Sequence, residues 1–451
     1  MSNRHRLSRA LLAAVLLLLS VGLYAAHLKL RAGGEPPPEV VGNGAGAGER
    51  ALQNGERLKE AMAHLQARLS SDPDDYEASL LKGLLYFKSG KLHSALTELN
   101  SLTHRAPKFY LAYLIQGDLL LAQTHTVTDI GRSPVLAGLK SKVDSEHLQQ
   151  LRQEAQVRLR AYLNSLQHRL LPRQLLALGP TVKMALVVDK HTHRLFVYRR
   201  RGDGKPPQLV RDFYVSTGKL AGNKQSSGDL RTPEGVYFVT RHIPGSQLPD
   251  MYGIGAFPVN YPNALDRHEG KTGSGIWLHG TANDYYSRPP QDSEGCVVLT
   301  NVDLKRVGRY ITPGSTPVVI TDSIDWVGHE SWEKERQAAL QALEQWRQDW
   351  DSGDVDKYLS HYAPDFWSKG YDYKRWVAHK RQVAQGKRTQ QVQLSDVSLF
   401  AYPRDASGDR RIVVADFDQH YRSNNFNSDI RKRLYLAQEH GQWKVIYEGT
   451  Q

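Results

Sequence analysis

The sequence of 451 residues contains a single cysteine, Cys296. One cysteine cannot form a disulfide within the chain, which excludes a disulfide-stapled scaffold. Metal-binding patterns are scarce as well, because no His-Glu-x-x-His segment is present and His191 and His193 lack a third ligand nearby. We therefore predict neither a catalytic metal nor a cofactor.

Acidic residues are outnumbered, with 47 Asp and Glu against 59 Lys and Arg, and the net charge is +12. Such a charge suits a polyanionic environment of wall polymers and lipid headgroups. Nucleic acid is the alternative explanation, but the basic residues are dispersed and the N-terminus has the composition of an export signal. We predict no nucleic-acid partner.

The N-terminus begins with a short basic segment, followed by uncharged, mostly apolar residues from 10 to 26. This composition is typical of an export signal, which is either cleaved or retained as an anchor. Tyr24 is bulky where a cleavage site prefers a small residue, so we favour an uncleaved membrane anchor within residues 1–30. The prediction places the chain in the cell envelope, on the periplasmic side of the inner membrane. Residues 31–55, rich in Gly, Pro and Ala, are expected to form a flexible linker.

Residues 56–178 show apolar residues at helical spacing. Counted from Tyr76, four residues occupy signature positions of a tetratricopeptide repeat, namely Gly83, Tyr86, Ala95 and Pro107. Residues 124–138 look like an irregular insertion in the repeat. A helical repeat region can form a groove for an envelope protein partner, or it can be a spacer packed against a neighbouring domain, and both interpretations remain open.

The most informative stretch runs from Ile276 to Leu299, with apolar ends and a polar centre. It contains His279 and Cys296, and an exported free thiol is reactive, paired with another chain, or hidden. A nearby histidine can take the proton from a thiol and later protonate a leaving amine. Gly295 removes a side chain beside the thiol, so the N–H groups of Gly295 and Cys296 are candidates to face an oxyanion. A buried structural cysteine beside an unrelated histidine is the alternative.

The order His-Gly-Thr, polar loop, Ser-x-Gly-Cys resembles the L,D-transpeptidase (YkuD-type) family of bacterial cell-wall enzymes. The resemblance covers residues 184–322 and includes segments that stand in family order before the His and Cys segments. These are Ala185-Leu186-Val187-Val188-Asp189, Arg194-Leu195-Phe196-Val197-Tyr198, Tyr214-Val215-Ser216-Thr217-Gly218-Lys219 and Thr232-Pro233-Glu234-Gly235-Val236-Tyr237.

The resemblance implies acyl transfer on a peptidoglycan stem peptide. Cys296 would be the nucleophile, His279 the base and then the acid, and the Gly280 carbonyl would orient the imidazole. Ser293 would fix the loop or contact substrate, unless it only forms the turn. The candidate walls of the substrate cleft, each of which is otherwise core or rim packing, are Trp277, Tyr252, Tyr261, Tyr285 and Tyr286.

Three departures from the family motif stand out. The loop between His279 and Ser293 is slightly short, Glu294 replaces the usual histidine, and Val298 replaces Asn or Arg. A carboxylate pointing at the thiol would disfavour the thiolate, so we expect Glu294 to face solvent or a cation. The departures bear on acceptor choice and substrate binding more than on the nucleophile.

The catalytic domain, placed at residues 180–323, is predicted to be a β-sandwich or barrel-like sheet. The expected strands are 184–189, 194–199, 208–216, 235–241, 275–278 and 317–321. Residues 250–266, which contain Gly253, Gly255 and Pro258, are predicted to form a long loop able to act as a lid.

Residues 331–451 are predicted to form a C-terminal α+β cone. An amphipathic helix over 331–351 comes first, then helices near 355–362 and 371–385, and antiparallel strands follow. The run from Trp346 to Phe366 resembles the nuclear-transport-factor-two-like (SnoaL-like) superfamily, which implies a ligand-binding or dimerising accessory role. The whole chain is thus predicted to be a multidomain α+β protein with an N-terminal anchor, a helical repeat region, a β-rich YkuD-type domain and this cone.

Two other functions remain open at this stage. The same Cys-His pair can pass the acyl group to water, which would make the protein an L,D-carboxypeptidase or hydrolase. The chain can also be a non-catalytic envelope scaffold that recruits partners through its helical and C-terminal regions.

Overall fold

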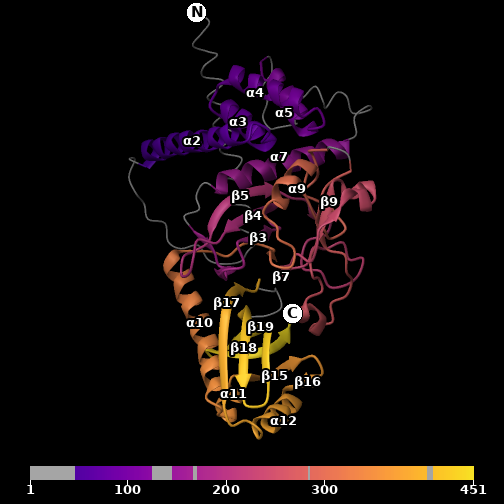
Figure 1. Ribbon diagram of the computed structural model, residues 1–451. Coiled ribbons are helices and arrows are strands. Elements are labelled where there is room, and N and C mark those ends of the chain that lie inside the picture. The colour runs from indigo at the N-terminus through magenta and orange to yellow at the C-terminus, as the bar shows by residue number, and fades with distance from the viewer. Residues whose placement is uncertain (1–45, 124–144, 166–169, 283–284, 404–409) are drawn as a thin grey trace, which may run out of the picture. The chain divides into compact units, whose positions relative to one another are not determined.

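The structure is a computed structural model that describes residues 46–123, 145–165, 170–282, 285–403 and 410–451 (Figure 1). The chain divides into two compact units. The first, here called the helical unit, comprises the chain up to residue 167 together with Tyr285–Pro290, and the second comprises His168–Asp284 and Gln291–Gln451. The predicted anchor over residues 1–30 lies outside the described residues. No helix in the described ranges is long and apolar enough to cross a membrane.

The helical unit contains five helices among its described residues: α2 (Gly46–Ser71), α3 (Tyr76–Lys88), α4 (Leu92–Arg105), α5 (Tyr110–Leu121) and α7 (Ser145–Ser165). Asp75 caps α3 by accepting a hydrogen bond from the Ala78 N–H at 3.0 Å. A Cβ at Gly83 would lie 3.1 Å from Leu99, so the small residue allows α3 and α4 to pack closely. The paired helices agree with the predicted pattern, whereas membership of the tetratricopeptide class stays a prediction.

Two predicted boundaries of this region are wrong. Residues 46–55, expected to be flexible, belong to α2, because good helix formers such as Glu49, Ala51 and Leu52 outweigh the three glycines of this stretch. The helical region also does not reach residue 178. Residues 171–172 and 175–177 form short strands of the second unit. The predicted insertion at 124–138 lies outside the described residues.

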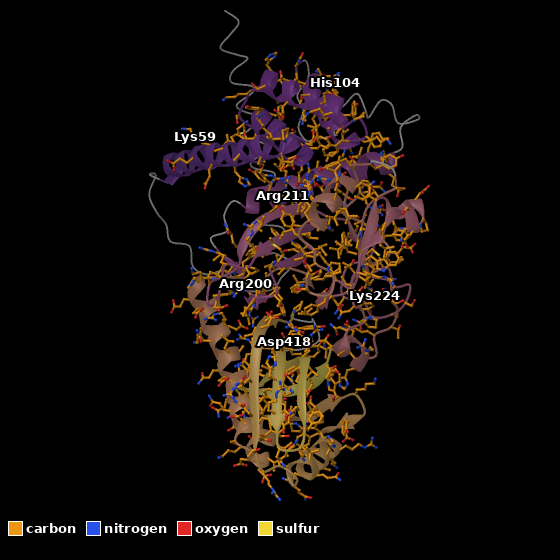
Figure 2. All side chains as sticks on the ribbon, viewed as in Figure 1. Lys59, His104, Arg200, Arg211, Lys224 and Asp418 are labelled. Atoms are coloured by element: carbon orange, nitrogen blue, oxygen red, sulfur yellow. The ribbon has the colours of Figure 1, made fainter. Side chains whose placement is uncertain are left out.

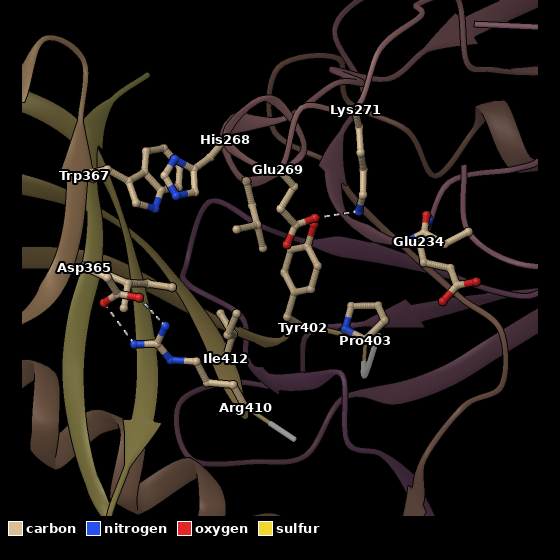
Figure 3. Close-up of a pocket in the computed structure, with 13 residues that line it drawn as sticks. Glu234, His268, Glu269, Lys271, Asp365, Trp367, Tyr402, Pro403, Arg410 and Ile412 are labelled. Atoms are coloured by element: carbon tan, nitrogen blue, oxygen red, sulfur yellow. Dashed lines mark hydrogen bonds and ion pairs between the residues drawn. The ribbon is translucent and has the colours of Figure 1, made fainter. Parts of the chain in front are cut away.

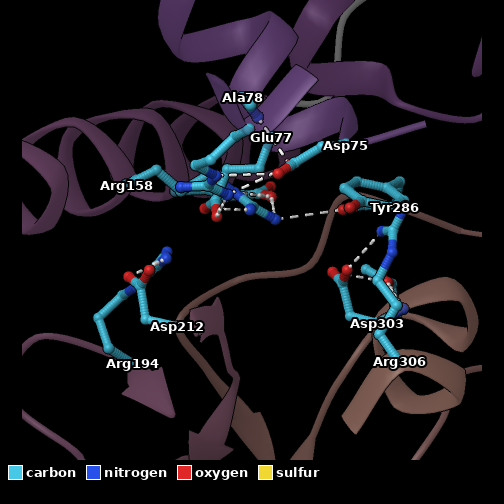
Figure 4. Close-up of polar contacts among 12 residues, drawn as sticks. Asp75, Glu77, Ala78, Arg158, Arg194, Asp212, Tyr286, Asp303 and Arg306 are labelled. Atoms are coloured by element: carbon cyan, nitrogen blue, oxygen red, sulfur yellow. Dashed lines mark hydrogen bonds and ion pairs between the residues drawn. The ribbon is translucent and has the colours of Figure 1, made fainter. Parts of the chain in front are cut away.

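A buried charge cluster ties α3 to α7 inside the helical unit (Figure 4). The Arg158 guanidinium lies 2.9 Å from Glu77 and 2.8 Å from Glu154, and all three residues are nearly fully buried. Burial raises the pKa of the Glu154 carboxyl to about 7. The Arg158 guanidinium acts in the opposite direction, but the Glu77 carboxylate shares that guanidinium and its charge raises the pKa of Glu154 as well. Glu154 therefore takes up its proton much more readily in the folded unit than in an unfolded chain.

This shift predicts that the helical unit loses stability as pH rises. Between the ordinary pKa of 4.5 and the folded value of about 7, the folded state keeps a proton that the unfolded state has released. The full loss is at most about 3 kcal/mol. Hydrogen exchange of α7, corrected for intrinsic rates, should show weaker protection at pH 8 than at pH 5. Glu154→Gln should remove most of that difference, and equal protection of the native protein at both pH values would contradict the prediction.

The first part of the second unit is rich in short strands. In chain order these are β1 (Leu171–Pro172), β2 (Leu175–Ala177), β3 (Met184–Asp189), β4 (Arg194–Arg199), β5 (Gln208–Tyr214), β6 (Thr217–Gly218), β7 (Gly235–Phe238), β8 (Ile243–Pro244), β9 (Gly255–Pro258), β10 (Trp277–His279), β11 (Gln291–Ser293), β12 (Val297–Val298), β13 (Pro317–Thr321) and β14 (Trp326–Val327). The helical pieces between them are η1 (Gly245–Gln247), η2 (Asp250–Tyr252), α8 (Ala264–His268) and α9 (Asn301–Gly308).

These strands form two main sheets, with strand orders β5-β4-β3-β13-β7 and β12-β10-β9-β8. Residues from both sheets share one hydrophobic core, for example Leu186 and Ile320 from the first and Leu278 and Val297 from the second. The predicted sandwich-like arrangement is therefore confirmed. The smaller pairs β6-β11 and β1-β14 lie outside these sheets.

The C-terminal part of the second unit contains α10 (His329–Asp351), α11 (Val355–Ser360), β15 (Tyr362–Ser368), β16 (Tyr371–Asp372), α12 (Tyr373–Ala384), β17 (Gln390–Ala401), β18 (Ile412–Ser423), β19 (Asn427–Glu439) and β20 (Gln442–Thr450). Its sheet has the order β16-β15-β20-β19-β18-β17-β2, so β2 adds an edge strand from far upstream. Helix α10 buries Trp332, Leu343 and Trp346, as its predicted amphipathic pattern requires. The predicted helix over 355–362 ends earlier, because Tyr362 starts β15.

A second hydrophobic core joins the two parts of this unit. In β3, Leu186 and Val188 pack into the sandwich core, whereas Ala185 and Val187 pack with Phe400, Val414 and other residues of the C-terminal sheet. Because β3 is covered on both faces, its sequence is a continuous apolar run from Met184 to Val188. The C-terminal domain is thus packed against the sheet β5-β4-β3-β13-β7.

The basic residues are spread over many elements and are not gathered on one (Figure 2). Lys59 lies on α2, Arg200 follows β4, Arg211 lies on β5 and Lys224 follows β6. Lys224 is buried, whereas Lys59 of the helical unit is exposed and Arg200 and Arg211 of the second unit are partly exposed.

Candidate active site

Strands β10 and β12 bring His279 and Cys296 to the same face of one sheet. The two strands are parallel neighbours, with Leu278 opposite Val297 and His279 opposite Val298. Cys296 directly precedes β12, so this parallel register continued by one residue places it beside Trp277, two residues before His279. Side chains alternate along a strand, so Leu278 and Val297 enter the core while His279 and Cys296 lie on the other face. This register corresponds to about 8 Å between their Cα atoms, a separation that the two side chains can bridge.

The imidazole of His279 is held by its own neighbour. Its Nδ1 lies 2.7 Å from the Gly280 carbonyl oxygen, an arrangement in which Nδ1–H donates and Nε2 is left as the basic nitrogen. The side chain is buried. The Tyr252 ring packs edge-on against the imidazole, with ring centroids 4.9 Å apart. These contacts fix both the tautomer and the orientation of the ring.

The turn before Cys296 is shaped by Ser293 and Gly295. The buried Ser293 hydroxyl donates to the Cys296 carbonyl at 2.6 Å and accepts from the Gly295 N–H at 3.2 Å. Gly295 has φ of 127°, and a Cβ there would lie 2.8 Å from the Arg231 carbonyl oxygen. The Cys296 side chain is partly exposed, and its Sγ lies 3.4 Å from the Gly275 carbonyl oxygen.

This turn changes two of the predicted roles. The Gly295 N–H is already bonded to Ser293, so Gly295 contributes backbone freedom and not a free donor for an oxyanion. Ser293 fixes the loop internally, and no substrate contact follows from its buried position. Glu294 is exposed to solvent, as expected.

The predicted aromatic walls separate into two groups. Tyr252 and Trp277 are partly exposed, and their rings pack together with centroids 4.9 Å apart, beside His279. Burial raises the pKa of the Tyr252 phenol, and negative charge on Cys296 and Glu294 acts in the same direction. Tyr252 therefore lies within electrostatic reach of the sulfur as well as against the imidazole.

The remaining three tyrosines are placed elsewhere. Tyr261 is a core residue, 5% exposed, whose hydroxyl donates to the Thr272 carbonyl oxygen. Tyr285 and Tyr286 belong to the helical unit, where Tyr286 is buried against Phe109 and the exposed Tyr285 contacts Tyr110. The predicted lid is also wrong, because residues 255–258 form β9, a fully buried strand between β8 and β10.

Comparison with known proteins now adds to this geometry. Residues 183–320 match the family model described as the L,D-transpeptidase catalytic domain, and residues 338–449 match the Cds6 C-terminal NTF2-like domain. The solved structure of Bd1075 from Bdellovibrio bacteriovorus is 32% identical and covers 62% of this chain and 98% of its own, with a TM-score of 0.54. The chain belongs to the YkuD-type L,D-transpeptidase family.

Two further relatives support the assignment. Pgp2 of Campylobacter jejuni, described as a helical cell shape determining protein, is 25% identical over 61% of this chain and 95% of its own, with a TM-score of 0.52. YafK of Escherichia coli K12, provisionally named an L,D-transpeptidase, is 30% identical over 138 residues, or 30% of this chain. The chain spans about half, 49%, of the length of that curated relative.

Asn301, at the start of α9, is a site residue that the sequence did not reveal. Its side-chain oxygen accepts from the N–H groups of Ile254 and Thr281, both at 3.2 Å, and its amide donates to the Thr281 carbonyl at 2.9 Å. A Cβ at Gly280 would lie 2.2 Å from that side-chain oxygen. Glycine beside the histidine thus allows Asn301 to fasten the chain after β10 to the chain before β9.

We predict that Asn301→Ala destabilises the protein and weakens catalysis. The substitution leaves three backbone groups at a buried position without their partner, which should lower the free energy of unfolding by about 3 kcal/mol. Asn301 holds Thr281, the neighbour of Gly280, and the Gly280 carbonyl orients the His279 imidazole. Loss of that support should lower kcat/KM on a stem peptide about tenfold. Calorimetry and steady-state kinetics measure the two effects. Asn301→Asp keeps the accepting oxygen and should lie between the two proteins, whereas an Ala variant with native stability would refute the role.

A cavity of about 250 Å³ lies elsewhere in the second unit, among residues of both its parts (Figure 3). Its charged side chains already have partners, since Lys271 lies 2.8 Å from Glu269 and Arg410 lies 2.6 Å from Asp365. The residues that line this cavity do not include His279 or Cys296. Across the described ranges, no group of three or more His, Cys, Asp and Glu side chains could hold a metal ion.

Proposed function

We propose that this chain catalyses acyl transfer on a peptidoglycan stem tetrapeptide in the cell envelope, through a thioester on Cys296. Membership of the L,D-transpeptidase family supports a peptidoglycan substrate. The arrangement that carries the proposal is the β10–β12 register, which gives His279 and Cys296 the same face, together with the bond from His279 Nδ1 to the Gly280 carbonyl.

In the proposed reaction, Nε2 of His279 takes the proton of the Cys296 thiol, and the sulfur attacks the carbonyl carbon of the third residue. The tetrahedral intermediate collapses as the bond to the terminal D-alanine breaks. His279 gives its proton to the leaving amine. An acceptor amine then attacks the thioester, loses a proton to His279 and restores the thiolate, which leaves a cross-linked or protein-attached product.

Water is the alternative acceptor of the acyl group. The Cys296 side chain is partly exposed, so water can reach the thioester. Hydrolysis of the thioester would yield a tripeptide and make the protein an L,D-carboxypeptidase. Incubation of the purified full chain with disaccharide tetrapeptide, followed by mass spectrometry of the products, separates the two. Dimeric muropeptides are the expected result for transfer, and tripeptide alone would assign hydrolysis.

Covalent labelling tests the alternative that the chain is a scaffold without catalytic activity. A carbapenem should acylate Cys296, because the same attack on a strained carbonyl forms a stable acyl-enzyme. Native protein should gain the mass of one carbapenem, and Cys296→Ala should gain none. Folded native protein without an adduct would favour the scaffold interpretation.

A further inference from the structure

Glu294 is the charged residue nearest in sequence to Cys296, and the proposed reaction gives it no role. The two residues are two positions apart, so their Cα atoms are at most about 7 Å from each other. Both side chains reach solvent, since Glu294 is exposed and Cys296 is partly exposed. Within the described ranges, the Glu294 carboxylate makes neither a salt bridge nor a hydrogen bond. It is therefore available to a ligand that approaches the sulfur.

The turn that carries Glu294 is held by contacts on both sides. The Ser293 carbonyl accepts from the Lys219 N–H at 2.9 Å, and the Ser293 hydroxyl donates to the Cys296 carbonyl at 2.6 Å. On the other side, Gly295 has φ of 127°, and a Cβ there would lie 2.8 Å from a backbone carbonyl oxygen. The backbone of Glu294 consequently has a fixed position relative to the sulfur.

Tyr252 relates the carboxylate to the reactive pair. Its ring packs against the His279 imidazole, with centroids 4.9 Å apart. Burial raises the pKa of the Tyr252 phenol, and negative charge on Cys296 and on Glu294 raises it further. Because solvent screens charges at long range, both groups lie near this one phenol. The carboxylate, the sulfur and the imidazole thus lie around the same tyrosine.

A carboxylate in this position opposes the reaction unless a cation neutralises it. Its charge disfavours the thiolate of Cys296, which is the attacking species. At a separation of about 7 Å in a solvated site, the thiolate population falls about threefold. Two basic residues, Lys219 and Arg231, have backbone groups beside the turn, but neither side chain forms a salt bridge with the carboxylate in the described ranges. The neutralising group must then come from the substrate.

We propose that the Glu294 carboxylate binds a primary ammonium group at the end of the side chain of the substrate's third residue. The proposal rests on the proposed function, in which the sulfur attacks the carbonyl of that same residue. A side chain that ends in an amine extends roughly 6 Å from its Cα, so it can reach a carboxylate two positions from the sulfur. The bound ammonium forms a charge-assisted hydrogen bond and cancels the charge that opposes the thiolate. The sulfur is therefore activated most when a substrate with this ammonium is in place.

Glu294→Gln in the full chain tests the ammonium site with two disaccharide tetrapeptides. In one the third residue ends in a primary amine, and in the other that amine is acetylated. Native protein should prefer the amine, measured as the ratio of kcat/KM values for D-alanine release. The variant should lose about tenfold of this preference, because a charge-assisted hydrogen bond becomes a neutral one. An unchanged preference would overturn the proposal, as would a loss of dimers with native D-alanine release, which would place the ammonium on the acceptor.

Alkylation of Cys296 by iodoacetamide should change in the opposite direction. Without substrate, Glu294→Gln should react about threefold faster than native protein near neutral pH, because the charge that opposes the thiolate is gone. A purely structural role for Glu294 predicts instead that the substitution disturbs the turn and slows both alkylation and turnover. Slower or equal alkylation in the variant would therefore contradict the proposal.

Two matched variants serve as controls. Glu294→Asp keeps the charge and should keep most of the preference for the amine. Asp322→Asn removes an exposed carboxylate of the same domain and should alter neither the preference nor the alkylation rate.

Binding to Cys296→Ala, which cannot form the thioester, separates this proposal from the proposed function. By calorimetry, that variant should bind the amine tetrapeptide about tenfold more tightly than the double variant that also carries Glu294→Gln. Equal binding would overturn the ammonium site. If the difference in binding is found but native protein releases no D-alanine, the ammonium site stands and the proposed function is wrong.

Discussion

Replacing Cys296 by Ala is expected to abolish turnover of stem peptides, with a loss on the order of 10⁴-fold or more. The reason is chemical, because Cys296 is the only cysteine in the chain and no other thiol can form the thioester. The fold should hardly change. The side chain is partly exposed, and its 3.4 Å contact with the Gly275 carbonyl is a weak thiol bond. The unfolding free energy should therefore change by less than about 1 kcal/mol.

Steady-state release of D-alanine and calorimetry on the same preparation measure both quantities. Cys296→Ser is the matched variant, since it keeps the size of the side chain and a hydrogen-bond donor but not an easily ionised sulfur. It should retain the native melting temperature and lose nearly as much activity as the alanine variant. Substantial D-alanine release by Cys296→Ala would place the nucleophile elsewhere.

Replacing His279 by Ala is expected to lower kcat by about 10²- to 10⁴-fold, because both the proton acceptor for the thiol and the donor to the leaving amine are lost. The bond from Nδ1 to the Gly280 carbonyl disappears with the imidazole. Near neutral pH, alkylation of Cys296 by iodoacetamide should slow as well, because a thiol reacts through its thiolate. At high pH the two proteins should converge as hydroxide replaces the imidazole as base.

His242→Ala is a suitable control. His242 is an exposed histidine of the same domain whose ring stacks on Phe257, and its loss should alter neither kcat nor the alkylation profile. An unchanged alkylation rate in His279→Ala at neutral pH would show that the imidazole does not activate the sulfur. The pairing of the two residues would then be structural only.

The sequence pointed to His279 and Cys296 because that signal is local, and their reactivity stays a prediction. Cys296 and His279 each stand beside short apolar runs, and the alternation of side chains along those runs decides which residues enter the core. Asn301 gave no such signal, since its three bonds reach backbone groups that are distant in sequence. Tyr286 looked like a cleft residue because an aromatic in a polar loop does not reveal which unit buries it.

The predicted elements agree with the structure where a hydrophobic pattern extends over many residues. They differ where pairing with a distant strand determines the conformation. The buried face of α10 follows from helical spacing over 23 residues. By contrast, β2 has only three residues, and it is a strand because it pairs with β17, more than 200 residues later. Residues 255–258 were read as loop from their glycine and proline, yet pairing with β8 and β10 makes them a central strand.

The most direct test is to detect the acyl group on the Cys296 sulfur. The full chain is mixed with disaccharide tetrapeptide, quenched in acid after a short time and analysed by intact-mass spectrometry. A protein carrying the disaccharide tripeptide acyl group is expected, with the added mass located on the peptide that contains Cys296 and removed by hydroxylamine. His279→Ala should accumulate the adduct far more slowly. Release of D-alanine at the native rate without any adduct on Cys296 would contradict a thioester mechanism.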